Sequence, residues 1–221
     1  MVELITSDFS PSKIVCVGRN YIDHAKELGN EVPTAPLLFL KAPSSFIENG
    51  EAIVLPEQSK QVEHEAELGI VIAKRCKDLA DDADVKEYIK GFTCVNDVTA
   101  RDIQRQDVQF TRGKSFDTFC PIGPHIAAAL DTTDIAVICR VNGEIRQSGR
   151  TSQMVFSPAF LIRYISRQMT LMPGDVISTG TPAGVGLGFN PPQYLIAGDV
   201  VELGIDGLGA QRQIIKAARP A

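Results

Sequence analysis

The sequence predicts an α+β chain that is rich in β-strand and built on mixed or antiparallel sheets. Eight short runs of Val, Ile, Leu and Phe are bounded by Gly, Pro, Asn or Asp, as strands usually are. Only three segments have helical character, and they do not alternate with the strands as in a Rossmann-like sheet. Because the chain has neither an internal repeat nor a Ser/Gly-rich linker, we expect one domain over 1–221, with a lead-in at 1–12 and a core at about 13–215.

The expected strands share one composition, since each is rich in branched or aromatic apolar residues and is closed by residues that favour turns. In chain order they lie at 13–17, 36–41, 53–55, 68–73, 92–98, 135–141, 175–179 and 200–205. The run LGIVI within 68–73 has no polar side chain, which indicates a buried strand.

Each of the three expected helices carries a start or stop signal. The first, at 21–28, ends at Gly29, which suits the left-handed conformation of a helix C-terminus. The second, at 83–89, follows an acidic stretch, and acidic residues are favourable at a helix N-terminus. The third, at 157–168, opens with Ser-Pro and has apolar residues at helical spacing.

Composition excludes several classes of protein. The formal charge of −5 argues against nucleic acid as a partner, because phosphate binding needs a basic surface. No apolar run approaches the ~20 residues of a membrane helix, and the N-terminus lacks the apolar segment of a secretory signal. The five cysteines are odd in number and widely spaced, which predicts buried free thiols in a reducing compartment. We expect a cytoplasmic protein that binds neither nucleic acid nor membranes.

The stretch VEHEAELGIVI at 62–72 is the first candidate for chemistry. Side chains alternate between the faces of a strand, so Glu65 and Glu67 project from one face, which Glu63 shares if the strand begins that early. Adjacent carboxylates raise each other's pKa unless a cation lies between them, and Mg²⁺ and Mn²⁺ prefer oxygen ligands. The two glutamates are therefore candidate metal ligands; the alternative is a solvated strand edge.

Asp97 is a third candidate ligand. The strand at 92–98 can present its carboxylate in a cleft, where it would complete a three-carboxylate site with Glu65 and Glu67. An Asx-turn or a helix cap at the end of the strand is the alternative role for Asp97. Asp102 is the rival ligand, although it is also placed to pair with a nearby arginine.

His24 and Glu27 form a candidate acid–base pair, because residues three apart share one face of a helix. A carboxylate beside an imidazole fixes its tautomer and raises its basicity, as a general base for water requires. Such pairs also occur on solvated helices.

The Gly-rich string at 184–188 leads into Phe-Asn-Pro-Pro rather than a helix, so we reject it as a dinucleotide fingerprint.

Seven strings in a fixed order resemble the fumarylacetoacetate hydrolase family, in particular its small acylpyruvase and oxaloacetate-decarboxylase branch. They are VCVGRNYIDHAKE (15–27), PLLFLKAPSSF (36–46), HEAELGIVI (64–72), VNDVTARDIQ (95–104), TRGKSFDTFCPIGP (111–124), VNGEIRQSG (141–149) and PGDVISTGTPAGVG (173–186). The resemblance covers nearly all of the chain between residues 13 and about 205. It implies a β-rich fold of rolled mixed sheets, usually assembled as a homodimer.

The resemblance also implies the residues of the site. A divalent metal, Mg²⁺ or Mn²⁺, would be held by the two glutamates of HEAE and the aspartate of VND, the three carboxylates discussed above. His24 and Glu27 would activate water from a segment that orders as a lid over the ligand, and Lys114 of GKSF would face the substrate. The same cleft would be lined by Arg19, Lys41, Arg101, Gln104 and Thr181.

The implied activity is metal-dependent hydrolysis of acylpyruvates, small α-keto acids that are cleaved to pyruvate and a carboxylic acid. Decarboxylation of oxaloacetate and enol–keto tautomerisation share the pyruvate enolate, so the sequence does not separate these reactions. The nearest alternative is an isomerase or decarboxylase of hydroxymuconate-type diacids in aromatic catabolism. That alternative requires a second basic group for the distal carboxylate, and Arg105, Arg112 and Arg150 are available. A non-catalytic ligand-binding protein is disfavoured because the proposed ligands and the dyad are all present.

Overall fold

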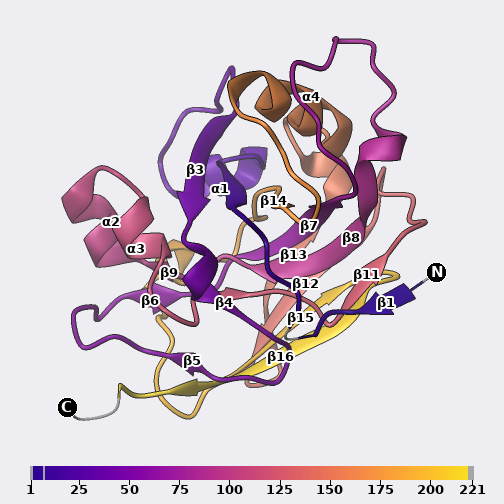
Figure 1. Ribbon diagram of the computed structural model, residues 1–221. Coiled ribbons are helices and arrows are strands. Elements are labelled where there is room, and N and C mark those ends of the chain that lie inside the picture. The colour runs from indigo at the N-terminus through magenta and orange to yellow at the C-terminus, as the bar shows by residue number, and fades with distance from the viewer. Residues whose placement is uncertain (1, 7, 219–221) are drawn as a thin grey trace.

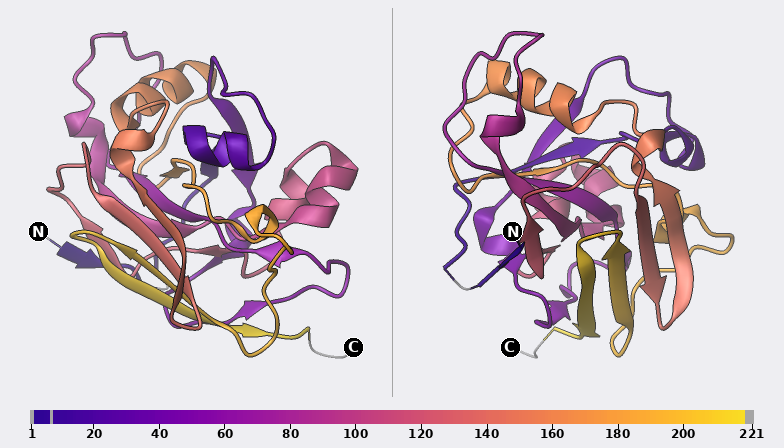
Figure 2. Two further views of the ribbon diagram at one scale, coloured as in Figure 1. Left: turned by 180° about the vertical axis from the view of Figure 1, so that it is seen from behind. Right: turned by 90° about the vertical axis from the view of Figure 1, so that its right-hand side faces the viewer.

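The structure is a computed structural model that describes residues 2–6 and 8–218. Over these residues the chain forms two large β-sheets and two small strand pairs, with a few short helices around them (Figures 1 and 2). The larger sheet contains, in spatial order, β1 (Val2–Leu4), β11 (His125–Ala127), β8 (Ile89–Asn96), β7 (Ala66–Ile72), β14 (Val176–Ser178), β2 (Ile14–Gly18) and β3 (Leu37–Lys41). The second contains β13 (Glu144–Arg150), β12 (Ala136–Val141), β15 (Val200–Ile205), β16 (Gly209–Lys216) and β5 (Ile53–Val54).

The remaining elements are small. β10 (Cys120–Pro121) pairs with β4 (Phe46–Ile47), and β6 (Val62–Glu63) pairs with β9 (Thr99–Ala100). The α-helices are α1 (Ile22–Glu27), α2 (Arg101–Asp107), α3 (Thr111–Lys114) and α4 (Pro158–Gln168). Single 3₁₀ turns lie at Pro43–Ser45, Lys86–Tyr88, Thr151–Gln153 and Gly186–Gly188. Both large sheets are mixed, since β14 is parallel to β2 but antiparallel to β7, and β16 is parallel to β5 but antiparallel to β15. The predicted fold class is confirmed.

The central strand β7 is buried along its whole length. Leu68 and Ile70 point into the main core, which also contains residues of α4 and of the second sheet, whereas Val71 packs in a smaller core on the opposite face. Two-sided burial explains why the run is continuously apolar instead of alternating. Helix α4 lies at the opposite end of the molecule from the C-terminal strands β15 and β16, which are yellow in Figures 1 and 2.

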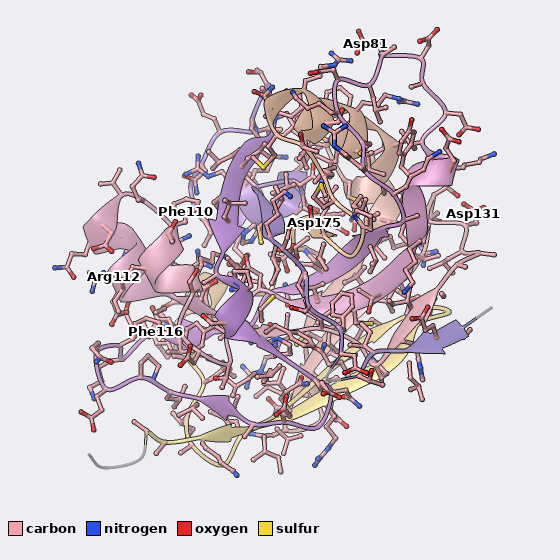
Figure 3. The ribbon with its side chains drawn as sticks, in the orientation of Figure 1. Asp81, Phe110, Arg112, Phe116, Asp131 and Asp175 are labelled. Carbon is pink, nitrogen blue, oxygen red and sulfur yellow. The ribbon has the colours of Figure 1, made fainter. Side chains whose placement is uncertain are left out.

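Asp175 connects the start of β14 to the segment that leads into β2. Its Oδ1 accepts hydrogen bonds from Ser12 Oγ (2.6 Å) and Lys13 N (3.1 Å), and its Oδ2 accepts one from Met172 N (2.7 Å). Figure 3 shows Asp175 inside the molecule, in contrast to Asp81 at the periphery. These bonds set the register of β14, the strand that carries one of the partners of the acidic site described below.

All eight expected strands are present, with ends displaced by a few residues. The expected helix at 83–89 is wrong, because that segment contains one 3₁₀ turn and Ile89 already begins β8. Asp84 accepts a hydrogen bond from Lys86 N (3.1 Å), so the acidic stretch forms a turn rather than a helix start. Both other helices are confirmed: Gly29 ends α1 with φ +68°, and Ser157 caps α4 by accepting from Phe160 N.

Elements that lack an apolar period are not predicted from the sequence. Helix α2 (sequence RDIQRQD) has a single apolar residue, Ile103, and β16 turns Gln211 and Gln213 inward beside Ile215. The five cysteines are free and buried, as expected. In the described part of the chain, no helix has both the length and the apolar character needed to span a membrane.

Candidate active site

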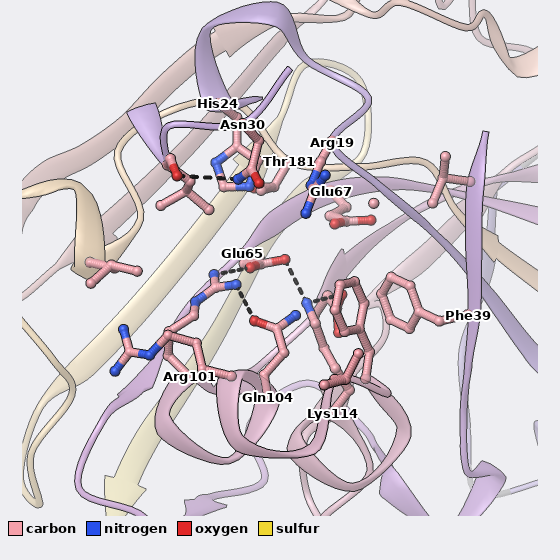
Figure 4. A pocket seen from close by; sticks show the side chains of 18 residues that line it. Arg19, His24, Asn30, Phe39, Glu65, Glu67, Arg101, Gln104, Lys114 and Thr181 are labelled. Atoms are coloured by element: carbon pink, nitrogen blue, oxygen red, sulfur yellow. Dashed lines mark hydrogen bonds and ion pairs between the residues drawn. The ribbon is translucent and has the colours of Figure 1, made fainter. Parts of the chain in front are cut away.

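Three buried carboxylates meet where β7 begins and β8 ends. Ala66 is paired with Asn96 in the antiparallel ladder, so the residues next to this pair, Glu65 and Asp97, are neighbours, and Asp97 N donates to Glu65 O (2.9 Å). Glu67 lies two residues along β7 from Glu65 and shares its face. Ligand oxygens of the three residues lie within 4.8 Å of one another, and all three side chains are buried. Figure 4 shows two of them, Glu65 and Glu67, in the cavity.

Three cationic side chains surround the acidic triad. Lys114 Nζ donates to Glu65 Oε2 (2.8 Å) and to Asp97 Oδ2 (2.6 Å). Lys41 Nζ donates to the other carboxylate oxygen of Asp97 (2.6 Å), and Arg101 donates to Glu65 Oε1. The charges of Lys114 and Arg101 outweigh burial and hold the pKa of Glu65 below its ordinary value.

Glu67 has no cationic hydrogen-bond partner among the described residues. Its Oε2 accepts from Ser178 Oγ (2.6 Å) and Gly180 N (2.8 Å), both of which are neutral donors. Burial, reinforced by the charges of Asp97 and Glu65, raises the pKa of Glu67 to about 8. A set of clustered oxygen donors that includes one uncompensated carboxylate fits a hard divalent cation such as Mg²⁺ or Mn²⁺.

The triad lies in a cavity of about 400 Å³. The other predicted residues that line it are Arg19, His24, Arg101, Gln104, Lys114 and Thr181. Lys41 and Glu27 are not among the lining residues. Each contacts a residue that does line the cavity: Lys41 donates to Asp97, and Glu27 lies within hydrogen-bond distance of His24. Thr181 lines the cavity, but its hydroxyl already donates to Ala66 O (2.9 Å) and accepts from Gln147 Nε2 (2.7 Å).

The predicted dyad is formed on α1. His24 Nδ1 lies 3.2 Å from Glu27 Oε2, and His24 is 4% exposed. A hydrogen bond from Nδ1–H to the carboxylate leaves Nε2 as the acceptor nitrogen of a neutral imidazole. Glu27 Oε1 accepts from Gly184 N (2.8 Å), and a Cβ at Gly188 would lie 2.0 Å from that oxygen. The Gly-rich string therefore encloses Glu27, in agreement with its rejection as a dinucleotide motif.

Two residues of the site were not assigned their role from the sequence. Glu63 lies outside the triad: its Oε1 accepts from Arg101 Nε (2.6 Å) and its Oε2 from Leu187 N (2.7 Å). The apolar run that contains Phe39 predicts a packing residue at this position, yet its ring lines the cavity, with its centroid 5.0 Å from Lys114 Nζ in a cation–π contact. The sequence contains no local signal for either contact, since both depend on α2 and α3, which lack an apolar period.

The alternatives left open for Asp102 are also resolved. Its carboxylate accepts from Ser59 Oγ (2.6 Å), Lys60 N (2.9 Å) and Ile103 N (2.9 Å), so it does not belong to the triad. Nor does it pair with Arg101, which binds Glu63 and Glu65 instead.

The geometry is matched by known proteins. A family model described as "Fumarylacetoacetate (FAA) hydrolase C-terminal" matches residues 13–216. The chain belongs to the fumarylacetoacetate hydrolase family. Within that family it is 51% identical over 209 residues to an uncharacterized protein of Methanocaldococcus jannaschii, covering 95% of this chain and 85% of that protein.

Two further similar proteins have named activities. The human mitochondrial oxaloacetate tautomerase FAHD2A is 46% identical over 204 residues, which span 90% of this chain and 65% of that protein. The structure of a 5-carboxymethyl-2-hydroxymuconate delta-isomerase from Mycobacterium smegmatis matches with a TM-score of 0.87 and 41% identity, over 99% of this chain and 83% of that one. The resemblance of the seven strings to the fumarylacetoacetate hydrolase family is confirmed at the level of the family.

Proposed function

We propose that this family member acts on α-keto acids through an enolate, with a divalent cation in the acidic triad, and that enol–keto tautomerisation of oxaloacetate is its main reaction. The observation that carries the proposal is the convergence of Glu65, Glu67 and Asp97 with the cationic Lys114 and Arg101 in one buried cavity. A relative that is 46% identical and named as an oxaloacetate tautomerase supports the choice of reaction.

The side chains around the triad suit the stabilisation of negative charge on oxygen. A divalent cation held by the three carboxylates would act as a Lewis acid on the keto oxygen. Burial alone would lower the pKa of Lys114, but Asp97 and Glu65 hold it above its ordinary value, so the amine stays protonated. Lys114 and Arg101 thus add fixed positive charge beside the developing enolate, where water cannot screen it.

His24 supplies the proton transfer that tautomerisation requires. The proton moves between the enol oxygen and the carbon next to the ketone, and His24 lines the cavity in which both atoms would lie. Its Nε2 would accept the proton from one atom and return it to the other, while Glu27 keeps Nδ1 protonated. Arg19 and Gln104 line the same cavity and would hydrogen-bond to a carboxylate of the substrate.

The dyad favours a second candidate, the hydrolysis of acylpyruvates to pyruvate and a carboxylic acid. His24 with its orienting Glu27 is the arrangement that a general base for water needs. His24→Ala should then reduce acylpyruvate hydrolysis by ~10²–10⁴-fold. Loss of CO₂ from oxaloacetate requires no attack by water and should decline much less, so equal losses in both reactions would exclude the water-activating role.

One experiment separates the candidates. Purified protein, with Mg²⁺ or Mn²⁺ and in parallel with EDTA, is given oxaloacetate, acetylpyruvate and fumarylpyruvate, while enol absorbance and released pyruvate are both recorded. Metal-dependent loss of the oxaloacetate enol without pyruvate release supports the tautomerase. Pyruvate from an acylpyruvate would establish the hydrolase instead, and pyruvate from oxaloacetate alone the decarboxylase. No change in any of the three substrates, with metal bound, would refute enolate chemistry.

The homodimer implied by the family resemblance stays a prediction. Light scattering on the eluate of a gel-filtration column measures the mass directly, and a mass equal to one chain would contradict it. The chain mass is 23.9 kDa.

A further inference from the structure

The cavity has a second cationic position, farther from the triad, on the helix that carries Arg101. Helix α2 lines the cavity with Arg101, Gln104 and Arg105, residues three and four apart that share one face. Arg101 is 5% exposed, whereas Arg105 is exposed, and Val108 just beyond the helix is 80% exposed. Because an α-helix rises ~1.5 Å per residue, Arg105 lies about 6 Å farther along the helix axis, towards the solvent.

The two arginines differ in what they already bind. Arg101 is held by Glu63, Glu65 and the Oε1 atom of Gln104, so most of its N–H groups are committed within the protein. In the described part of the chain, Arg105 makes one polar contact, a donation from Nη2 to the neutral amide oxygen of Gln61, and no carboxylate lies within ion-pair distance of it. Its guanidinium charge is therefore available to an anion in the cavity.

The other basic residues that could serve a distal carboxylate are turned elsewhere. Arg112 is paired with Asp107 (2.5 Å) and Arg150 with Asp134 (2.6 Å), and neither arginine lines the cavity. Figure 3 shows Arg112 at the outer edge of the molecule, beside the α2–α3 pair. The structure thus brings one of the three basic residues considered from the sequence, Arg105, to the cavity.

We propose that Arg105 binds the second carboxylate of a dicarboxylate substrate and selects diacids over monoacids that share the same α-keto acid end. This inference rests on the proposed function, which puts the α-keto acid end at the acidic triad. The position of Arg105 one helical turn beyond Arg101 suits a short aliphatic chain between the two carboxylates, with a guanidinium that can bind the distal one through two parallel N–H groups.

Arg19 is the competing residue for the same role. It also lines the cavity, and Figure 4 shows it beside Glu67, on the other side of Glu65 from Arg101. A carboxylate bound by Arg19 would therefore lie across the triad from α2, whereas one bound by Arg105 would lie along α2.

The test measures binding rather than turnover. With Mn²⁺ present, calorimetry gives the Kd of 2-oxoglutarate, a diacid, and of 2-oxobutyrate, a monoacid with the same α-keto acid end. Arg105→Gln should raise the Kd of 2-oxoglutarate by about tenfold, because one charge-assisted pair is lost. The Kd of 2-oxobutyrate should stay within about twofold of the wild-type value. Arg112→Gln is the matched control, because it removes the same side chain from a neighbouring helix outside the cavity, and it should change neither Kd.

Two further measurements sharpen the result. Arg105→Lys keeps the charge without the planar fork and should recover part of the lost affinity. The preference of the wild type for the diacid should shrink as salt is raised, because Arg105 is exposed and its charge is screened.

The outcomes that contradict the proposal are distinct. The proposal would be overturned if Arg105→Gln raised the Kd of both ligands equally, or if it left the Kd of 2-oxoglutarate unchanged. Either result would leave the proposed function intact. The proposal would also be overturned if Arg19→Gln, but not Arg105→Gln, selectively weakened the binding of 2-oxoglutarate. That result would assign the binding of the distal carboxylate to Arg19. If neither ligand bound the wild type with Mn²⁺ present, the proposed function itself would fail, and this inference with it.

Discussion

Glu67 is the carboxylate whose surroundings most favour a bound cation. Ser178 and Gly180 fix one of its oxygens through neutral hydrogen bonds, while Glu65 and Asp97 add negative charge close by. Lys114 and Lys41 compensate the other two carboxylates directly, but neither contacts Glu67. At the scale of single residues, therefore, the need for a cation is concentrated on this one side chain.

Glu67→Gln should abolish metal affinity and activity together while the protein still folds. The amide oxygen of Gln can still accept from Ser178 and Gly180, so the change removes the charge and keeps the hydrogen bonds. Calorimetry with Mn²⁺ measures the affinity, and circular dichroism checks the fold. Full activity with undiminished Mn²⁺ binding would refute the assignment of Glu67 as a ligand.

Metal binding at Glu67 should also compete with protons. Since its pKa is raised to about 8 in the metal-free protein, the side chain is mostly protonated below that pH and the cation must displace the proton. The apparent affinity for Mn²⁺ should fall by up to about tenfold per pH unit between pH 8 and 6. A pH-independent Kd over that range, measured by calorimetry in buffers of matched ionic strength, would contradict this account.

At the scale of elements, the loop around the 3₁₀ turn Gly186–Gly188 joins two parts of the site. Gly184 N donates to Glu27 of the dyad, and Leu187 N donates to Glu63, which in turn binds Arg101. The glycines are required by close approach: a Cβ at Gly184 would lie 1.9 Å from Arg146 O. One loop therefore contacts both the dyad on α1 and, through Glu63, the arginine at the start of α2.

Gly188→Ala should impair catalysis more than stability. The new Cβ would lie 2.0 Å from Glu27 Oε1, and the cheapest relief is rotation of the Glu27 side chain away from His24. We expect His24-dependent turnover to fall by ~10²-fold, as small misplacements of catalytic groups do, with little change in Tm. Steady-state kinetics and thermal denaturation of the variant measure both. Unaltered turnover would show that Glu27 does not need its present position.

Ser157→Ala should destabilise the protein by about 1 kcal/mol through loss of the N-cap of α4. The Ser157 hydroxyl accepts from Phe160 N, and α4 packs Leu161, Ile162 and Ile165 into the main core. Urea denaturation gives the free energy of unfolding. Ser157→Asp is the control, because aspartate can also cap a helix N-terminus, and this variant should retain most of the wild-type free energy of unfolding.

At the scale of the whole molecule, the acidic triad couples stability to metal and pH. The folded metal-free protein binds the Glu67 proton more tightly than the unfolded chain does, whose pKa is near 4.5. The contribution of this group is therefore present below about pH 4.5 and is lost as pH rises towards about 8. Cation binding to the folded state adds stability by mass action, and more so at high pH.

We therefore expect Mn²⁺ to raise Tm over EDTA-treated protein, and by a larger amount at pH 8 than at pH 6. Oxalate, which resembles the pyruvate enolate, should raise Tm further only when Mn²⁺ is present. Differential scanning calorimetry measures both shifts. If Mn²⁺ left the Tm unchanged at both pH values, the result would contradict a metal site in the triad.

Much of the fold and the pairing of Glu65 with Glu67 could be predicted because their signals are local. The strands of the sheets carry continuous or bounded apolar runs, and the spacing of Glu65 and Glu67 puts them on one face of β7 whatever surrounds it. Helix α2 could not be predicted in this way, since Arg101 and Gln104 are buried by charge pairing and hydrogen bonds instead of apolar periodicity. The strand β16 also lacks an apolar period, because its inward face carries Gln211 and Gln213 beside Ile215.

The sequence by itself determined the fold class, the shared face of Glu65 and Glu67 and the His24–Glu27 pair, because each depends on a short spacing within one strand or one helix. Asp97 joins the two glutamates only through the pairing of β7 with β8. Only the tertiary structure decided which charges meet. Arg101 binds Glu63 across 38 residues and Gly184 binds Glu27 across 157, so these contacts depend on how the sheets bring distant segments together. Likewise, whether an arginine such as Arg105 faces the cavity or pairs with an aspartate at the surface follows from the orientation of its helix, which no local pattern encodes.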